Sequence, residues 1–103
     1  AMLASALKVN NLIAIIDFNK WQATGRSQEI MSLDPLLEKW ISFGWQALEV
    51  DGHNFNELER AFIKTKKTTQ KPTVIVAHTI KGKGISFMED NNNWHYRTPN
   101  ESE

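Results

Sequence analysis

Three short apolar runs stand out along the chain, each bounded by polar or turn-forming residues. They are "NLIAIIDF" at 11–18, "WQALEV" at 45–50 and "TVIVAHT" at 73–79. Apolar side chains fill most consecutive positions, which is typical of strands that are buried on both faces. We therefore expect strands near 12–17, 46–50 and 73–78.

Apolar residues at helical spacing follow in "PLLEKWISFG", residues 35–44, which lies between the first two strands. Gly44 is the expected end of this helix, because glycine readily adopts the left-handed conformation found there. Ser32 or Asp34 is expected to cap its start, with Pro35 in the first turn.

A second amphipathic helix is predicted in "FNELERAFIKTKK", residues 55–67. Leu58, Ala61 and Phe62 are spaced along one of its faces. The opening "AMLASALK" has helix-forming composition and is expected to form the last turns of a helix whose beginning is absent. The polar stretch from Asn19 to Met31 is expected to be a long functional loop.

Strands that alternate with helices predict an α/β fold, with a parallel sheet and helical crossovers. The length of 103 residues allows one small domain, spanning 1–103. The tail from Asn91 onward has little apolar pattern, and we expect it to run over the surface.

Charge and composition exclude several classes of function. The 12 basic and 12 acidic residues balance, so neither nucleic acid nor an anionic membrane is an expected partner. The absence of cysteine excludes disulfides and thiol chemistry. "LIAII" is too short to span a bilayer, and no secretory leader opens the chain, so we expect a cytoplasmic protein.

Candidate chemistry follows two of the predicted strands, at the end where open parallel sheets bind ligands. Asp17 and Asn19 follow the first strand, and their oxygens suit magnesium. The loop Lys81-Gly82-Lys83-Gly84 follows the third strand, and its backbone and ammonium groups suit an anion. Taken alone, the Asx pair is more simply the end of a strand, and the loop lacks the spacing of a P-loop.

Histidines and tryptophans divide into structural and functional candidates. His53 is most simply a turn residue, and His78 is interpreted as a satisfied side chain at a strand end. His95 is the better ligand candidate, although a zinc site is not expected without a second ligand at metal spacing. Trp40 and Trp45 are core candidates, whereas Trp21 and Trp94 lie in polar surroundings typical of interfaces or pockets.

Four segments in order carry a resemblance to a known family: "NLIAIIDFNKWQATG", "EKWISFGWQALEVDGHN", "KPTVIVAHTIKGKGISFMED" and "NWHYRTP". They resemble the diphosphate-binding domain of transketolases, and above all the N-terminal subunits of split transketolases. Deoxyxylulose-phosphate synthases match these segments less well. The chain as a whole resembles the C-terminal half of that domain.

The resemblance implies a site for thiamine diphosphate and Mg²⁺. It assigns the metal to the Asn19 side chain and the Trp21 carbonyl, and leaves Asp17 structural. It places Lys81 and His95 beside the cofactor, with His95 near both the diphosphate and the bound sugar as the catalytic candidate. Gln22 falls in the same loop and is expected to line the pocket.

Two departures from the family pattern change this picture. The family's "GDG" segment, which carries a further metal ligand, is expected upstream of this chain, so residues 1–103 are interpreted as a partial domain. Tyr96 stands where many transketolases have glycine after the histidine, which leaves the preferred sugar open.

The resulting hypothesis is that the chain forms part of a transketolase, with weak cofactor binding and no activity when isolated. Transketolases transfer a two-carbon ketol unit from a ketose to an aldose, here a sugar phosphate or a related substrate. A pyrimidine-binding subunit or domain is the expected partner, in an oligomer. The alternative is a truncated, non-catalytic remnant that serves as an interaction or structural module.

Overall fold

The predicted strands form one parallel sheet in the computed structural model, which describes residues 1–67 and 70–103. They are β1 (Ile13–Phe18), β4 (Gln46–Asp51) and β5 (Thr73–His78), in the order β1-β5-β4. The register pairs Thr73 with both Ile13 and Gln46. The predicted α/β architecture with helical crossovers is therefore confirmed.

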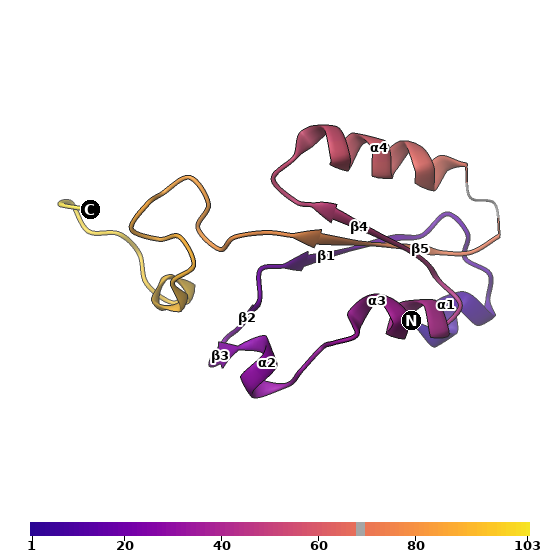
Figure 1. Ribbon diagram of the computed structural model, residues 1–103, viewed down its shortest axis with the longest axis horizontal. Coiled ribbons are helices and arrows are strands. Elements are labelled where there is room, and N and C mark those ends of the chain that lie inside the picture. Colours follow the sequence, from indigo (N-terminus) through magenta and orange to yellow (C-terminus); the bar gives the residue numbers. More distant parts are fainter. Residues whose placement is uncertain (68–69) are drawn as a thin grey trace.

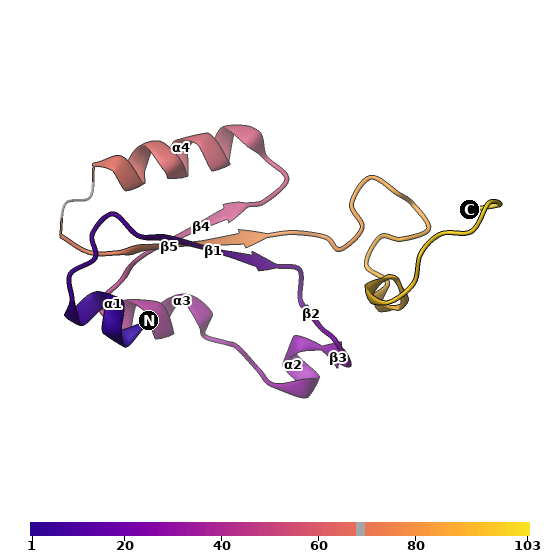
Figure 2. The same cartoon turned by 180° about the vertical axis from the view of Figure 1, so that it is seen from behind.

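The remaining elements flank this sheet or its ends. Helices cover both faces: α4 packs on one, and α1 and α3 lie on the other (Figures 1 and 2). The bounds are α1 (Met2–Ala6), β2 (Trp21–Gln22), β3 (Gly25–Arg26), α2 (Ser27–Ile30), α3 (Leu36–Ser42), α4 (Phe55–Lys66) and the 3₁₀ helix η1 (Asn92–His95).

The central strand β5 carries the core. Its residues from Thr73 to Ala77 are all buried, as expected for a strand with helices over both faces. Ile75 and Ala77 pack with Val50 of β4 and Ala61 of α4. Trp45 is also buried, and its ring contacts Trp40 edge-on with centroids 4.8 Å apart, which confirms Trp45 as a core residue.

β1 departs from the prediction of a buried strand. It lies at the edge of the sheet, and its residues alternate between exposed and half-buried. Ile13 and Ile15 are 39% and 56% exposed. The reason is coverage: α4 packs against β4 and the core, whereas these two side chains of β1 lie outside that cluster.

The start of α3 also differs from the prediction. Pro35 is the N-cap and no side chain caps the helix, so the expected capping by Ser32 or Asp34 was wrong. The Asp34 carboxylate instead accepts a hydrogen bond from Gln28 at 2.8 Å. The predicted end is confirmed, since Gly44 follows the helix with a φ of +86°.

α4 begins where the Asn54 side chain accepts hydrogen bonds from the backbone N–H groups of Asn56 and Glu57. Ala61 is buried on the face toward the sheet, as predicted. Phe62 is 38% exposed, so its assignment to that face was only partly right. It lies one position, about 100°, further round the helix.

The expected loop from Asn19 to Met31 contains structure of its own. β2 and β3 form a two-stranded antiparallel hairpin, and α2 follows directly. The tail after Asn91 extends away from the sheet, as Figure 1 shows. The radius of gyration is 16.1 Å, against about 13 Å for a compact domain of this length. The chain is therefore more extended than an ordinary small domain.

Candidate functional site

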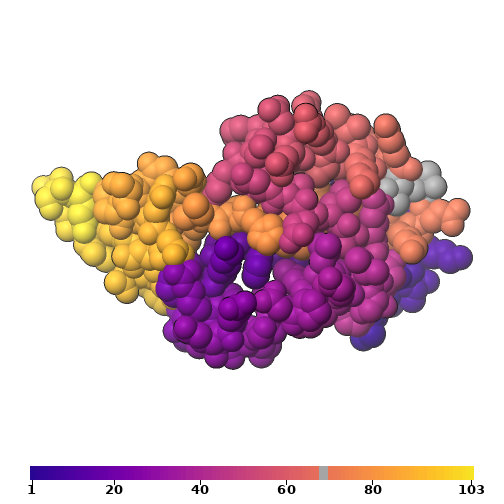
Figure 3. Space-filling model, in the orientation of Figure 1, coloured from indigo at the N-terminus to yellow at the C-terminus, as the bar shows by residue number. Residues whose placement is uncertain are grey.

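The carboxyl ends of β1 and β5 lie side by side, because Phe18 pairs with His78 in the parallel register. The loops that follow these strands therefore start together, and the N–H of Thr79 donates to the Phe18 carbonyl at 3.3 Å. In Figure 3 the orange C-terminal segment lies against the purple hairpin region. Between the two loops is a depression of about 370 Å³, lined by Asn19, Lys20, Thr79, Ile80, Glu89 and Asp90.

Asp17 and Asn19 have different surroundings, although they lie two positions apart. The Asp17 carboxylate accepts a hydrogen bond from the Thr79 hydroxyl, which ties the ends of β1 and β5 together. Asn19 lines the depression, and its side-chain oxygen accepts the backbone N–H of Trp21 at 2.9 Å. An amide oxygen accepts more than one bond, so it keeps capacity for a further partner.

Asp90 links the two loops through several contacts. Its carboxylate accepts hydrogen bonds from the two terminal guanidinium nitrogens of Arg26, at 2.7 and 2.6 Å, and from the indole N–H of Trp21 at 2.8 Å. The hydrogen bond from Arg26, reinforced by that from Trp21, lowers the pKa of Asp90 to about 2. Its backbone N–H donates to the Lys81 carbonyl at 2.9 Å. Asp90 and Arg26 were not singled out from the sequence, where they stand 64 positions apart.

The lysine-glycine loop adopts the conformation that its glycines permit. Gly82 and Gly84 have φ angles of +72° and +95°. The two lysines differ, because Lys83 pairs with Glu89 at 3.5 Å, whereas Lys81 has no ion pair among the described residues. The half-buried Lys81 is therefore the lysine with a charge still to be matched.

Of the residues assigned to the site, Asn19 lines the depression between the loops, whereas Trp21, Gln22, Lys81 and His95 do not. The Gln22 amide donates to the Met31 carbonyl at 3.2 Å, within its own loop. His95 is exposed at the end of η1, and its ring contacts Tyr96 edge-on with centroids 4.6 Å apart. Their assigned roles stay predictions.

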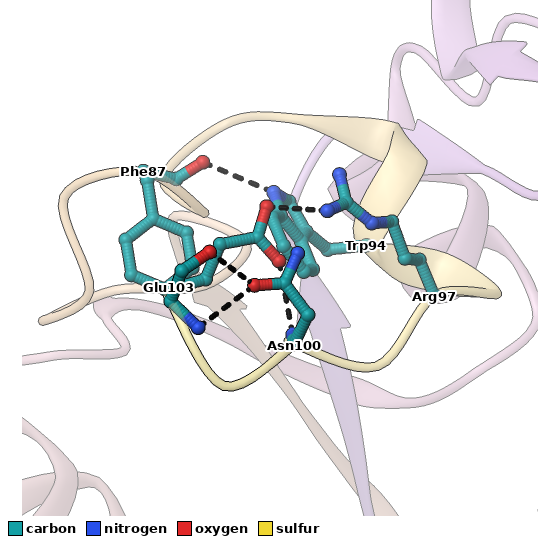
Figure 4. Close-up of polar contacts among 6 residues, drawn as sticks. Phe87, Trp94, Arg97, Asn100 and Glu103 are labelled. Atoms are coloured by element: carbon teal, nitrogen blue, oxygen red, sulfur yellow. Dashed lines mark hydrogen bonds and ion pairs between the residues drawn. The ribbon is translucent and has the colours of Figure 1, made fainter.

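Asn92, at the start of η1, holds the segment of His95 against the hairpin. Its side-chain N–H₂ donates to the carbonyls of Gln22 and Ala23 at 3.2 and 3.1 Å. Its side-chain oxygen is buried and has no partner among the described residues. Nearby, the Trp94 indole donates to the Phe87 carbonyl at 3.0 Å (Figure 4). Trp21 and Trp94 thus both use their polar atoms in this region, consistent with their predicted separation from the core.

The other two histidines take part in contacts around the strand ends. His78 contacts Glu49 at 2.6 Å, which confirms that it is a satisfied side chain. The ring of His53 accepts the backbone N–H of Ile80 at 2.8 Å. His53 therefore does more than form a turn, since it joins the β4–α4 connection to the loop that leads to Lys81.

The donors at this end of the sheet fit part of a magnesium site. Magnesium prefers six oxygen ligands in octahedral geometry. The Asn19 side-chain amide and the Trp21 carbonyl each offer an oxygen as a metal ligand, and they lie two residues apart in the chain. Within 1–67 and 70–103, no three His, Cys, Asp or Glu side chains are grouped to hold a metal ion. A diphosphate and a carboxylate from elsewhere would have to complete the set.

In the described part of the chain, no helix combines the length and the apolar character that a membrane span requires.

Comparison with known proteins identifies relatives over nearly the whole chain. The family model described as "Transketolase, thiamine diphosphate binding domain" matches residues 1–102. An apulose-4-phosphate transketolase subunit from Phocaeicola vulgatus is 40% identical over 99 residues, which are 96% of this chain and 35% of the relative. The 6-deoxy-6-sulfo-D-fructose transketolase subunit SqwG of a Clostridium species is 46% identical over 89 residues, 86% of this chain and 32% of the relative.

Solved structures agree with these relatives. The crystal structure of transketolase from Campylobacter jejuni matches with a TM-score of 0.83 and 27% identity, over 89% of this chain and 14% of that one. The chain spans about a third of the length of the two subunits that it matches. With a match to the family model at nearly every residue, the chain belongs to the family of the thiamine diphosphate binding domain of transketolase.

Proposed function

We propose that this chain supplies the diphosphate-side contacts of a thiamine-diphosphate-dependent transketolase, which moves a two-carbon ketol unit from a ketose to an aldose. The observation that carries the proposal is the position of the depression between the loops after β1 and β5. Open parallel sheets bind ligands at this end of their strands. Family membership supplies the identity of the ligand.

The site residues that this chain supplies have binding or orienting roles in this proposal. Asn19 and the Trp21 carbonyl hold Mg²⁺, and the Lys81 ammonium attracts the diphosphate as a point charge. We assign Gln22 to the pocket wall and His95 to the diphosphate and the sugar in the assembled enzyme, although neither lines the depression in this chain. When bound, thiamine diphosphate supplies the electron sink for the carbon–carbon chemistry, while the protein binds and orients it.

A partner subunit is part of the proposal, because two relatives are named as subunits of transketolases. The partner would bind the aminopyrimidine ring of the cofactor and supply the glutamate that activates it. The names of those relatives refer to apulose 4-phosphate and 6-deoxy-6-sulfo-D-fructose, so a sugar phosphate or a related anionic ketose is the proposed substrate class. We place this enzyme in the cytoplasm, as an oligomer.

The two lysines of the loop offer a matched test. The experiment uses the enzyme assembled from a protein that contains this chain and a pyrimidine-binding subunit, with thiamine diphosphate binding measured by calorimetry in Mg²⁺. Lys81→Gln removes the unmatched charge and should weaken binding about tenfold, which corresponds to about 1.4 kcal/mol. Lys83→Gln combined with Glu89→Gln removes a matched pair without leaving a bare carboxylate in the depression, and should change binding less than twofold, roughly.

Two outcomes would contradict the proposal at different levels. Equal effects of the two variants would remove Lys81 from its assigned role. Failure of the assembled enzyme to bind the cofactor or to transfer a ketol unit would favour the alternative, a non-catalytic interaction module.

A further inference from the structure

We propose that Asp90 is a positioning residue, which with Arg26 locks the loop after β1 to the loop after β5 and so sets the metal donors relative to Lys81. The expected effect on cofactor binding rests on the proposed function, whereas the link between the two loops rests on the contacts of Asp90. We call the Arg26–Asp90–Trp21 contacts the clip.

Asp90 is bonded to both loops at once. Its backbone N–H donates a hydrogen bond to the Lys81 carbonyl at 2.9 Å, which holds the two ends of the 81–90 loop together. Its carboxylate reaches across to the hairpin, where it binds Arg26 and Trp21. A movement of either loop therefore has to break these contacts or carry the other loop with it.

The clip lies at the surface, with the Arg26 and Asp90 side chains 36% and 52% exposed, but it has the geometry of a specific contact. The two terminal guanidinium nitrogens of Arg26 each donate to a different carboxylate oxygen of Asp90, which is the strong bidentate arrangement. The Arg26 guanidinium also lies 3.7 Å above the Trp21 ring, so its planar group is held from a second side. The indole N–H of Trp21 then binds the same carboxylate at 2.8 Å, which closes the cluster.

Charge also favours a positioning role over direct contact with the cofactor. Asp90 and Glu89 line the depression, where bare carboxylates would repel a diphosphate. Each has a cation as its partner, Arg26 for Asp90 and Lys83 for Glu89. Asp90 therefore acts through its neighbours: Trp21, whose carbonyl is the proposed metal donor, and Lys81, whose ammonium is the proposed diphosphate contact.

Asp90→Asn is the principal variant, because it changes charge while it keeps shape. Asp90 has a φ of +54°, and asparagine tolerates this left-handed conformation as well as aspartate does. Arg26→Gln breaks the clip from the opposite loop. Arg26→Lys keeps the charge without the bidentate fork, and should give an intermediate effect.

Glu103→Gln is the matched control. Arg97 pairs with Glu103 and lies 4.5 Å from the Trp94 ring, so this pair also combines an arginine, a carboxylate and a tryptophan (Figure 4). Its members belong to one C-terminal segment, so breaking it removes a similar contact without unlinking the two loops.

The first readout is hydrogen exchange in the cofactor-free chain, which does not depend on activity. Either clip variant should raise the exchange rate in both loops, residues 20–26 and 81–90, by roughly two- to fivefold, because the ion pair is partly exposed to solvent. Glu103→Gln should leave both loops unchanged. An increase in exchange rate confined to the substituted loop, or no increase, would contradict the proposed link between the two loops.

The second readout separates cofactor binding from turnover in the assembled enzyme. Asp90→Asn should raise the Kd of Mg²⁺–thiamine diphosphate about tenfold, as loss of a group that orients a metal ligand does, with kcat at saturating cofactor retained. An unchanged Kd, or an equal change in Glu103→Gln, would overturn the positioning role. Absence of binding by the unmodified enzyme would instead sink the proposed function, and the exchange data would still decide whether the clip exists.

Discussion

At the scale of single residues, two glycines of the lysine loop share a backbone requirement but differ in their surroundings. A Cβ atom at Gly82 would lie 2.7 Å from the Met88 carbonyl oxygen, whereas one at Gly84 would meet nothing within 4 Å. Both have positive φ, so alanine at either position costs about 1–2 kcal/mol. We predict a larger loss of unfolding free energy for Gly82→Ala, because the backbone of Met88 must also move.

Urea denaturation of the two variants, followed by circular dichroism, measures this difference. Exchange rates across 81–90 show whether the change is local to the loop. Equal losses in the two variants would mean that Met88 accommodates the added methyl group without cost.

At the scale of elements, β1 exposes apolar side chains that its position in the sheet leaves uncovered. Ile15 is 56% exposed at the middle of the strand. Exposed apolar patches mark surfaces that bind partners or other copies, so we predict that the chain self-associates or binds a partner through this strand. Ile15→Lys should shift the chain toward monomer, with a change in stability within about 0.5 kcal/mol because the side chain is solvent-facing.

Sedimentation velocity over a range of concentrations tests this prediction. Phe55→Lys is the control, since Phe55 is 87% exposed at the start of α4 and belongs to a different element. A strict monomer at high concentration for the unmodified chain would count against the prediction, as would an equal effect of both variants.

At the scale of the whole molecule, the chain carries only part of the proposed site. Its metal donors, the Asn19 amide and the Trp21 carbonyl, are neutral, and magnesium is usually held by a carboxylate together with phosphates. We predict that the isolated chain binds Mg²⁺–thiamine diphosphate only near the millimolar range. Two or three contacts are missing from the site, and we expect each to weaken the affinity about tenfold, which corresponds to about 1.4 kcal/mol. It should show no ketol transfer alone.

Calorimetry with the cofactor and Mg²⁺ provides the measurement, and a Lys81→Ala, His95→Ala double variant provides the baseline. Micromolar binding by the unmodified chain would show that the domain is sufficient by itself, which would contradict this view of the site.

The local pattern of the sequence determined the elements of this protein and the identity of its main loops. The three strands, the end of α3 at Gly44 and the glycine loop after β5 follow from side-chain periodicity and turn chemistry, which act over a few residues. Parallel pairing followed as well, because a helix between two strands returns the chain to the same end of the sheet. The predicted placement of two loops at one end of the sheet rested on the same reasoning.

Only the tertiary structure decided which strand lies at the centre of the sheet and how the loops are joined. The order β1-β5-β4 places β1 beyond the cover of α4, and no local pattern distinguishes an edge strand from a central one with similar residues. Asp90 meets Arg26 and Trp21 across 64 and 69 positions, so no spacing rule could have paired them. Such contacts depend on where the whole chain brings its loops, since a charge or an indole N–H has no preferred partner until the fold supplies one.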